Sequence, residues 1–197
     1  LELLSEGGAR SRGDVCTKRF PAQWSAEQGV EIGNSLNYLR LYPGEENAVL
    51  SMKPCTHTNL FGQRQQALLY AGAFGGSADL YMIPTPFGIS TEIVLTKKPE
   101  ASTFRLRIQV PSSYPDTGSP DYILFRDNHQ EKVLSLLYTP LAGDAAGHWS
   151  YENRIELTDK DSLQGTYQVE LTLDPEFLSA PTTRYPLTLH QSFALYT

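Results

Sequence analysis

The second half of the chain contains short stretches in which apolar and polar residues alternate. Every second residue is apolar in 103–110 and again in 166–173. A period of two is typical of a β-strand with one face on a core and the other in water. We therefore expect Arg105 and Arg107 to point outward. The side chains predicted to face a shared core are Phe104, Leu106, Ile108, Tyr167, Val169 and Leu171.

Strand-like runs cover most of the chain, and turn residues separate them. Segment 60–71 is ambiguous between helix and strand. One short helix is predicted near 175–180, because Asp174 can cap it, Pro175 suits its first position and Pro181 stops it. Strands are expected near 15–20, 30–41, 48–53, 80–83, 89–95, 104–110, 122–125, 133–138, 148–157, 167–173 and 187–195. Many strands without long alternating helices predict an all-β fold, an antiparallel β-sandwich of ordinary, large or double form.

The N-terminal residues differ from the rest. Segment 1–14 contains three glycines and shows no period, so we expect a flexible N-terminal segment there. Residues 15–197 are expected to form a single β-sandwich domain.

Composition excludes some classes of partner. Charged residues make up 19% of the 197 residues, and the net charge is −6. Binding to nucleic acid requires clustered Lys and Arg, and the sequence has no such block, so no nucleic-acid partner is expected. The longest apolar run, 67–74, is far shorter than the roughly 20 residues of a membrane helix, so no membrane insertion is expected.

No linear motif for catalysis or metal binding is present. The four histidines and two cysteines form no H-x-x-x-H or C-x-x-C pattern, so we expect no metal site, no cofactor and no catalytic residues. Segment 75–79 resembles a nucleophile elbow but lacks its final glycine. Paired carboxylates leave no linear trace, so a glycan-acting hydrolase stays open as an alternative.

The densest polar and aromatic cluster lies at 148–152. On an alternating strand, Trp149 and Tyr151 share one face, and His148 precedes them. The simpler interpretation places that face in the core. If the face is exposed, these three residues are candidate ligand-binding residues for a glycan or a protein.

Cys16 and Cys55 allow either one disulfide or two free thiols. An oxidising compartment would favour pairing. The pair would close a loop of about 40 residues, worth roughly 4 kcal/mol in the chain-entropy model.

Several segments resemble a module of bacterial surface proteins. Asp79-Leu-Tyr81, then 87–95 (FGISTEIVL) and 103–108 (TFRLRI), are similar to its "GxDLxY", "GxKExIVL" and "xTFRFRL" signatures. Segments 175–181 (PEFLSAP) and 185–189 (YPLTL) are similar to its "xxWLxDPxRxYPVxVDP" ending.

The resemblance covers about residues 74–192, with departures at three places. Thr91 stands where Lys usually precedes the glutamate, Phe177 stands for Trp, and His190-Gln191 stands for Asp-Pro. The domain would then consist of a variable lead-in, 15–73, and a family-like part, 74–197.

This module occurs beside DNRLRE-type domains and ahead of RHS/YD-repeat regions in secreted or wall-associated proteins. The resemblance implies a non-catalytic structural or interaction module of a secreted or cell-wall-attached bacterial surface protein, used for spacing, adhesion or domain docking. Its partners would be neighbouring domains of the same polypeptide or other surface proteins, and glycans are possible ligands. A carbohydrate-binding module and a glycan-acting hydrolase are the alternatives.

Overall fold

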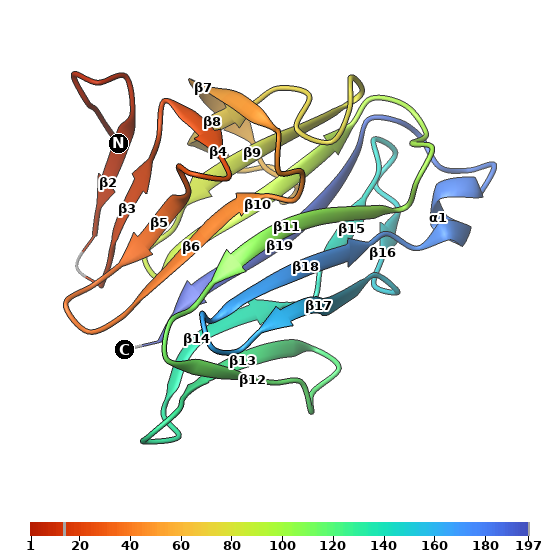
Figure 1. Cartoon of the computed structure of the whole chain (residues 1–197). Helices are drawn as coiled ribbons and strands as arrows, with labels where there is room; N and C mark the ends of the chain where they lie inside the picture. The colour runs from red at the N-terminus through yellow and green to blue at the C-terminus, as the bar shows by residue number, and fades with distance from the viewer. Residues whose placement is uncertain (14, 197) are drawn as a thin grey trace.

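Two antiparallel β-sheets pack face to face in the computed structural model, which describes residues 1–13 and 15–196. The predicted antiparallel β-sandwich is therefore confirmed. The first sheet has eight strands, and Figure 1 shows it in front of the second sheet. In spatial order its strands are β1 (Glu2–Leu3), β2 (Ala9–Arg12), β3 (Thr17–Phe20), β5 (Val30–Gly33), β6 (Tyr38–Pro43), β11 (Thr103–Gln109), β18 (Thr166–Thr172) and β17 (Arg154–Asp161).

The second sheet has eleven strands, and two of them, β15 and β16, lie beside its main path. In spatial order that path contains β12 (Ser113–Asp116), β13 (Tyr122–Asp127), β14 (Val133–Tyr138), β19 (Leu187–Leu195), β10 (Gly88–Leu95), β9 (Ala78–Pro84), β8 (Arg64–Tyr70), β7 (Val49–Thr58) and β4 (Gln23–Ser25). The hairpin of β15 (Leu141–Gly143) and β16 (Trp149–Ser150) pairs with β19 through β15.

The β11–β18 pair confirms the period of two. Phe104 lies opposite Leu171, and Leu106 lies opposite Val169. All six side chains predicted to share a core are buried, and Arg105 points into water. The strands alternate because only one face of the first sheet meets the second sheet.

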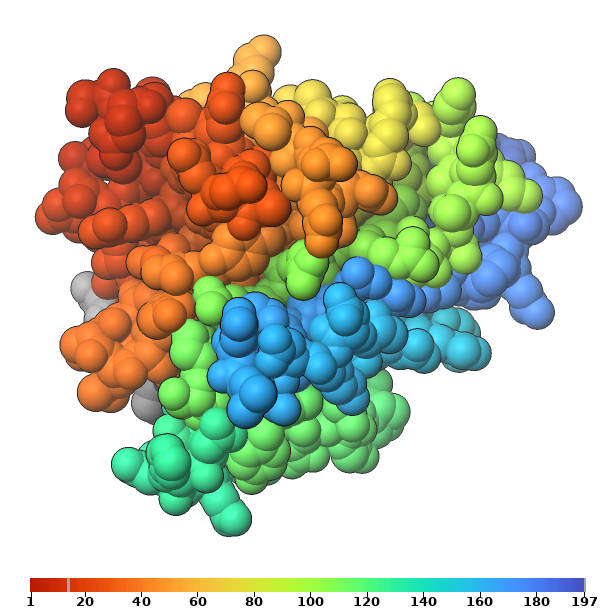
Figure 2. Space-filling view, viewed as in Figure 1, coloured from red at the N-terminus to blue at the C-terminus, as the bar shows by residue number. Residues whose placement is uncertain are grey.

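One hydrophobic cluster extends from Ala9 to Leu195 and includes residues of both sheets. The lead-in and the family-like part are joined within each sheet, because β6 pairs with β11 and β8 pairs with β9. Figure 2 shows segments of both parts side by side on the face that the first sheet presents. The two parts therefore share one sandwich.

The short helix forms where its capping residues predict it. Helix α1 spans Pro175–Ser179, and the Asp174 carboxylate accepts a hydrogen bond from the Glu176 backbone N–H at 2.9 Å. Leu178 fixes the helix to the core.

The N-terminal segment differs from the expectation of flexibility. Its described residues contain β1 and β2, which continue the first sheet, and Ala9 is buried in the core. Gly7, at φ +87°, forms the turn between these strands. The two strands are too short to show a period, and for this reason the sequence pattern missed them. Asp14, the last residue of the expected segment, lies outside the described residues.

Of the two states left open for Cys16 and Cys55, one disulfide or two free thiols, the structure has the second. Both cysteines are free. Cys16 is buried beside the first sheet, where its Sγ lies 3.7 Å from the carbonyl oxygen of Pro86. Cys55 lies on β7 of the second sheet, opposite Ala67. The fold therefore places one thiol beside the first sheet and the other on a strand of the second sheet.

Candidate functional site

The outer face of the second sheet, which points away from the core, contains a buried carboxylate. On β10, Thr91 and Ile93 point toward the core, so Glu92 between them points outward. Its side chain nevertheless has no exposed surface. A buried charge is costly unless it is paired and hydrogen-bonded, so the groups around Glu92 decide what this site is.

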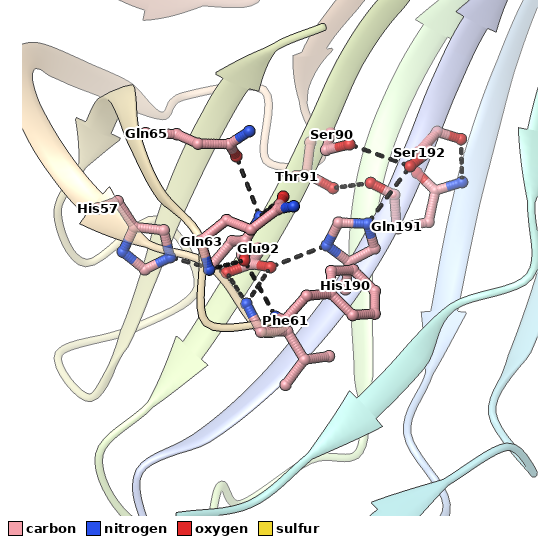
Figure 3. A network of polar contacts seen from close by, with 12 residues as sticks. His57, Phe61, Gln63, Gln65, Ser90, Thr91, Glu92, His190, Gln191 and Ser192 are labelled. Carbon is pink, nitrogen blue, oxygen red and sulfur yellow. Dashed lines mark hydrogen bonds and ion pairs between the residues drawn. The ribbon is translucent and has the colours of Figure 1, made fainter.

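Two histidines and one backbone amide bond to Glu92, as Figure 3 shows. His57 Nε2–H donates to Oε1 at 2.7 Å, and His190 Nδ1–H donates to Oε2 at 2.8 Å. The Leu60 N–H donates to Oε2 at 2.9 Å and to Oε1 at 3.2 Å. Burial alone would raise the pKa of Glu92, but these hydrogen bonds lower it to about 2. Glu92 is therefore ionised near neutral pH.

Strand register brings the histidines to Glu92. His190 lies opposite Glu92 on β19, and Tyr81 lies opposite it on β9. His57 reaches over from β7 and stacks on the Tyr81 ring, with ring centroids 3.9 Å apart and planes at 15°. The His57 ring is thus fixed by stacking on Tyr81 as well as by its hydrogen bond to the carboxylate.

A five-residue loop, 59–63, covers Glu92. We call it the tip loop, because it joins β7 to β8 at the tip of their hairpin. The Asn59 side-chain oxygen accepts hydrogen bonds from the backbone N–H groups of Phe61 (3.0 Å) and Gln63 (2.9 Å). Gly62 takes φ +80°, which only glycine adopts without strain. The loop is thus closed by its own hydrogen bonds and fastened to the sheet by the Leu60 N–H.

The tip loop places an aromatic ring above the network. Phe61 meets the His190 ring edge-on, with centroids 5.0 Å apart, and stacks with Trp149 of β16 at 6.1 Å and 21°. The Leu60 side chain fits against Gly143 of β15, where a Cβ atom would come within 2.6 Å of it. The tip loop therefore bridges β10 and the β15–β16 hairpin.

A chain of hydroxyl groups continues from His190. Its Nε2 lies 3.4 Å from the Ser192 Oγ, which lies 3.1 Å from the Ser90 Oγ. The order serine, histidine, carboxylate matches that of a hydrolase triad. However, 3.4 Å is long for such a bond, and Ser192 and His190 sit two residues apart on one flat strand rather than at a cleft. We interpret the chain as a structural hydrogen-bond network.

The side chains of the network are not arranged as a metal site. Within 1–13 and 15–196, no three or more His, Cys, Asp or Glu side chains are placed to bind one. In the Glu92 network each carboxylate oxygen is in direct contact with a ring nitrogen, which leaves no space for an ion between them.

Further exposed aromatic rings lie on the same outer face as the network. On β13 and β14, Ile123 and Leu137 are buried in the core, so their neighbours Tyr122 and Tyr138, which lie opposite each other, point outward. Both tyrosines are exposed, as are the stacked rings of the tip loop and β16. We call this surface the aromatic face, and it consists of Phe61, Tyr122, Tyr138 and Trp149.

The residues predicted from the sequence lie at the edge of this face. Trp149 is 43% exposed and Tyr151 is 74% exposed, so the interpretation that they face the core is wrong. The physical reason is that β16 ends at Ser150 and belongs to a two-strand hairpin at the side of the sheet. His148 is exposed and pairs with Asp144 at 3.0 Å within the hairpin turn. Trp149 joins the aromatic face, whereas His148 shapes the turn.

Sequence reasoning missed Glu92, His57, His190 and Phe61. His57 and His190 are 35 and 98 residues from Glu92 in sequence, so no local motif joins them. One signal was present: Glu92 is the lone charged residue inside the predicted strand of 89–95. An unexplained charge in a buried strand indicates a partner elsewhere.

An open groove of about 1260 Å³ lies near the loops 72–78 and 96–101, away from this network. Its charged lining residues are Glu45, Lys97, Lys98, Glu100 and Arg105. Arg105 is already paired with Glu170 of β18 at 3.2 Å. The groove therefore shows mixed charge.

Among the described residues, no helix has the length and apolar character needed to cross a membrane. Comparison of the chain with models of known protein families, with curated proteins and with solved structures finds no match. Its function must therefore be inferred from its own residues.

Proposed function

We propose that this chain is a non-catalytic interaction module that contacts its partner through the aromatic face. The observation that carries the proposal is the exposure of Phe61, Tyr122, Tyr138 and Trp149 on one side of a single sheet. Grouped apolar side chains in water indicate a contact surface, whereas scattered ones do not. Aromatic residues are also the type most enriched at protein interfaces.

The sheet makes this face suitable for recognition. The backbone of β13, β14 and β19 is fixed by ladder hydrogen bonds on both sides of β14. Rings on such a support lose little conformational entropy when they bind, because their positions are already set. The resemblance to modules of bacterial surface proteins supports a role in a secreted or wall-attached protein, where docking or adhesion requires such a surface.

Carbohydrate is the second candidate ligand. Sugar rings present apolar faces that stack on aromatic side chains, and their hydroxyl groups need hydrogen-bonding partners nearby. The aromatic face offers both, because the half-buried polar side chains of His190 and Ser192 lie on the same outer face. This juxtaposition favours a glycan over a purely apolar ligand.

The test is binding to isolated Gram-positive cell walls, measured by co-sedimentation with untreated and protease-treated walls. We expect Phe61→Ala and Trp149→Ala each to weaken binding about tenfold or more, as loss of an aromatic anchor does. Phe87→Ala is the matched control, because Phe61 and Phe87 are both 54% exposed and Phe87 lies in the β9–β10 turn. Circular dichroism checks that each variant is folded.

Protease treatment separates the two ligand classes. Binding that survives it supports a glycan, and binding that disappears supports a surface protein. Absence of wall binding, or equal binding of all three variants, would refute the role of the aromatic face. Release of reducing sugars from the walls, abolished by changing one carboxylate, would refute the non-catalytic assignment.

A further inference from the structure

We infer that Glu92 is a positioning residue: it holds Phe61 against Trp149, so that the aromatic face is assembled by a buried carboxylate and comes apart in acid. The biological meaning of this inference rests on the proposed function. The structural claim itself concerns only contacts within the chain.

Glu92 holds the tip loop in two ways. Both of its oxygens accept the Leu60 N–H, and Leu60 directly precedes Phe61. Glu92 also fixes the His190 ring, on whose edge Phe61 rests. The backbone and the ring that support Phe61 therefore depend on the same carboxylate.

Trp149 has supports of its own besides the tip loop. It lies on β16, whose hairpin turn is closed by Asp144 through hydrogen bonds from the His148 N–H at 2.8 Å and the Ala146 N–H at 3.0 Å. Asp144 also accepts the Arg184 N–H at 2.8 Å, which ties the turn to the segment before β19. Loss of Glu92 should therefore release Phe61 and leave Trp149 in place.

The groups around Glu92 show why acid should loosen the tip loop. The titratable groups that face it are His57 from β7, His190 from β19 and, behind His57, Tyr81 from β9. A protonated carboxyl loses acceptor capacity for the Leu60 N–H.

The carboxylate is ionised in the folded chain down to a pKa of about 2, below the ordinary value of 4.5. A depressed pKa means that the contribution of Glu92 to stability is fully present above about pH 4.5. It is lost as the pH falls from there toward about 2. The free energy that closes the tip loop should fall over the same window, and the loop should open mainly as the pH approaches about 2.

Two measurements on the isolated protein test the inference. Hydrogen exchange of the Leu60 amide reports the bond to Glu92. Iodide quenching of tryptophan fluorescence reports Trp149, because Trp24 is only 1% exposed and iodide does not reach it. Neither readout needs a ligand, so both results are independent of whether the protein binds cell walls.

Glu92→Gln is expected to lower the protection of the Leu60 amide by about tenfold or more, as local opening does. Protection of the Val169 amide in β18 should stay unchanged, which shows that the fold is intact. Iodide quenching of Trp149 should rise to the level of Phe61→Ala. The double variant should show no further rise, because both changes remove the same contact. Glu156→Gln, an exposed glutamate of β17, is the control and should resemble the unchanged protein.

Acid titration of the unchanged protein gives a second test that does not depend on the folding of Glu92→Gln. Quenching should rise as the pH falls toward about 2, where the folded carboxylate takes up its proton, and should rise less in Phe61→Ala, which already lacks the contact. Flat quenching in the unchanged protein, or Glu92→Gln with a protected Leu60 amide and normal quenching, would refute the inference.

Discussion

Replacement of Glu92 by glutamine should change how the stability of the whole protein depends on pH. The pKa of Glu92 is about 2, against an ordinary 4.5. A difference of this size corresponds to about 3 kcal/mol between the folded and unfolded chains. Because the pKa is depressed, this stabilisation is present above about pH 4.5 and falls as the pH drops toward about 2. About 2 kcal/mol of it should be lost between pH 5.5 and pH 3.

Urea unfolding at these two pH values measures the effect as the change in the free energy of unfolding. Other carboxylates with depressed pKa values, such as Asp144, contribute equally to both proteins, so the comparison isolates Glu92. The unchanged protein should lose about 2 kcal/mol more than Glu92→Gln between pH 5.5 and pH 3. The histidine rings are 13% and 15% exposed, so solvent screens the pair somewhat and the measured value should lie at or below this figure.

The control is Glu156→Gln, which should follow the pH dependence of the unchanged protein. Parallel curves for Glu92→Gln and the unchanged protein would refute the reasoning, because they would show that Glu92 has the same proton affinity in both states.

Two further substitutions and a thiol titration test the fold. Leu106→Ala should lower the free energy of unfolding by about 2–4 kcal/mol in urea titrations, because Leu106 is fully buried; a cost below about 1 kcal/mol would contradict its core position. Gly88→Ala should destabilise by more than about 2 kcal/mol, because the new Cβ would lie 2.0 Å from a carbonyl oxygen of β19. The matched control Gly76→Ala, with open space around the new Cβ, should have little effect on the free energy of unfolding. Equal destabilisation by the two substitutions would contradict the predicted steric clash at Gly88. Thiol titration after denaturation without reductant should find two free thiols. In the folded protein Cys55 should react, whereas Cys16 should be protected until unfolding. Finding no free thiol in the denatured protein would show a disulfide and contradict the prediction.

The fold was readable from the sequence where one face of a strand meets water. Strands β11 and β18 alternate clearly for that reason, and Asp174 with Pro175 marks helix α1. The pattern failed where both faces are covered or the strand is short. On β8 the consecutive residues Ala67 and Leu68 are both buried, which removed the alternation and left 60–71 ambiguous.

The candidate site was largely unreadable, because it forms from the pairing of distant strands. His190 meets Glu92 only through the register of β10 and β19, and His57 meets it only through the hairpin of β7 and β8. Trp149 was identified from local composition, yet its exposure depended on β16 lying at the side of the sheet. Residue types were visible in the sequence, whereas register and strand order were not.

The position of β19 has a consequence for how the protein is made. Strand β19 is the last strand along the chain, yet it lies in the middle of the second sheet, between β14 and β10. During synthesis, β10 and β14 must wait with open edges until residues 187–195 emerge from the ribosome. Contacts between such distant segments slow folding, and open edges can pair with other chains. Yield of folded protein during expression should therefore depend on how fast the C-terminal strand becomes available.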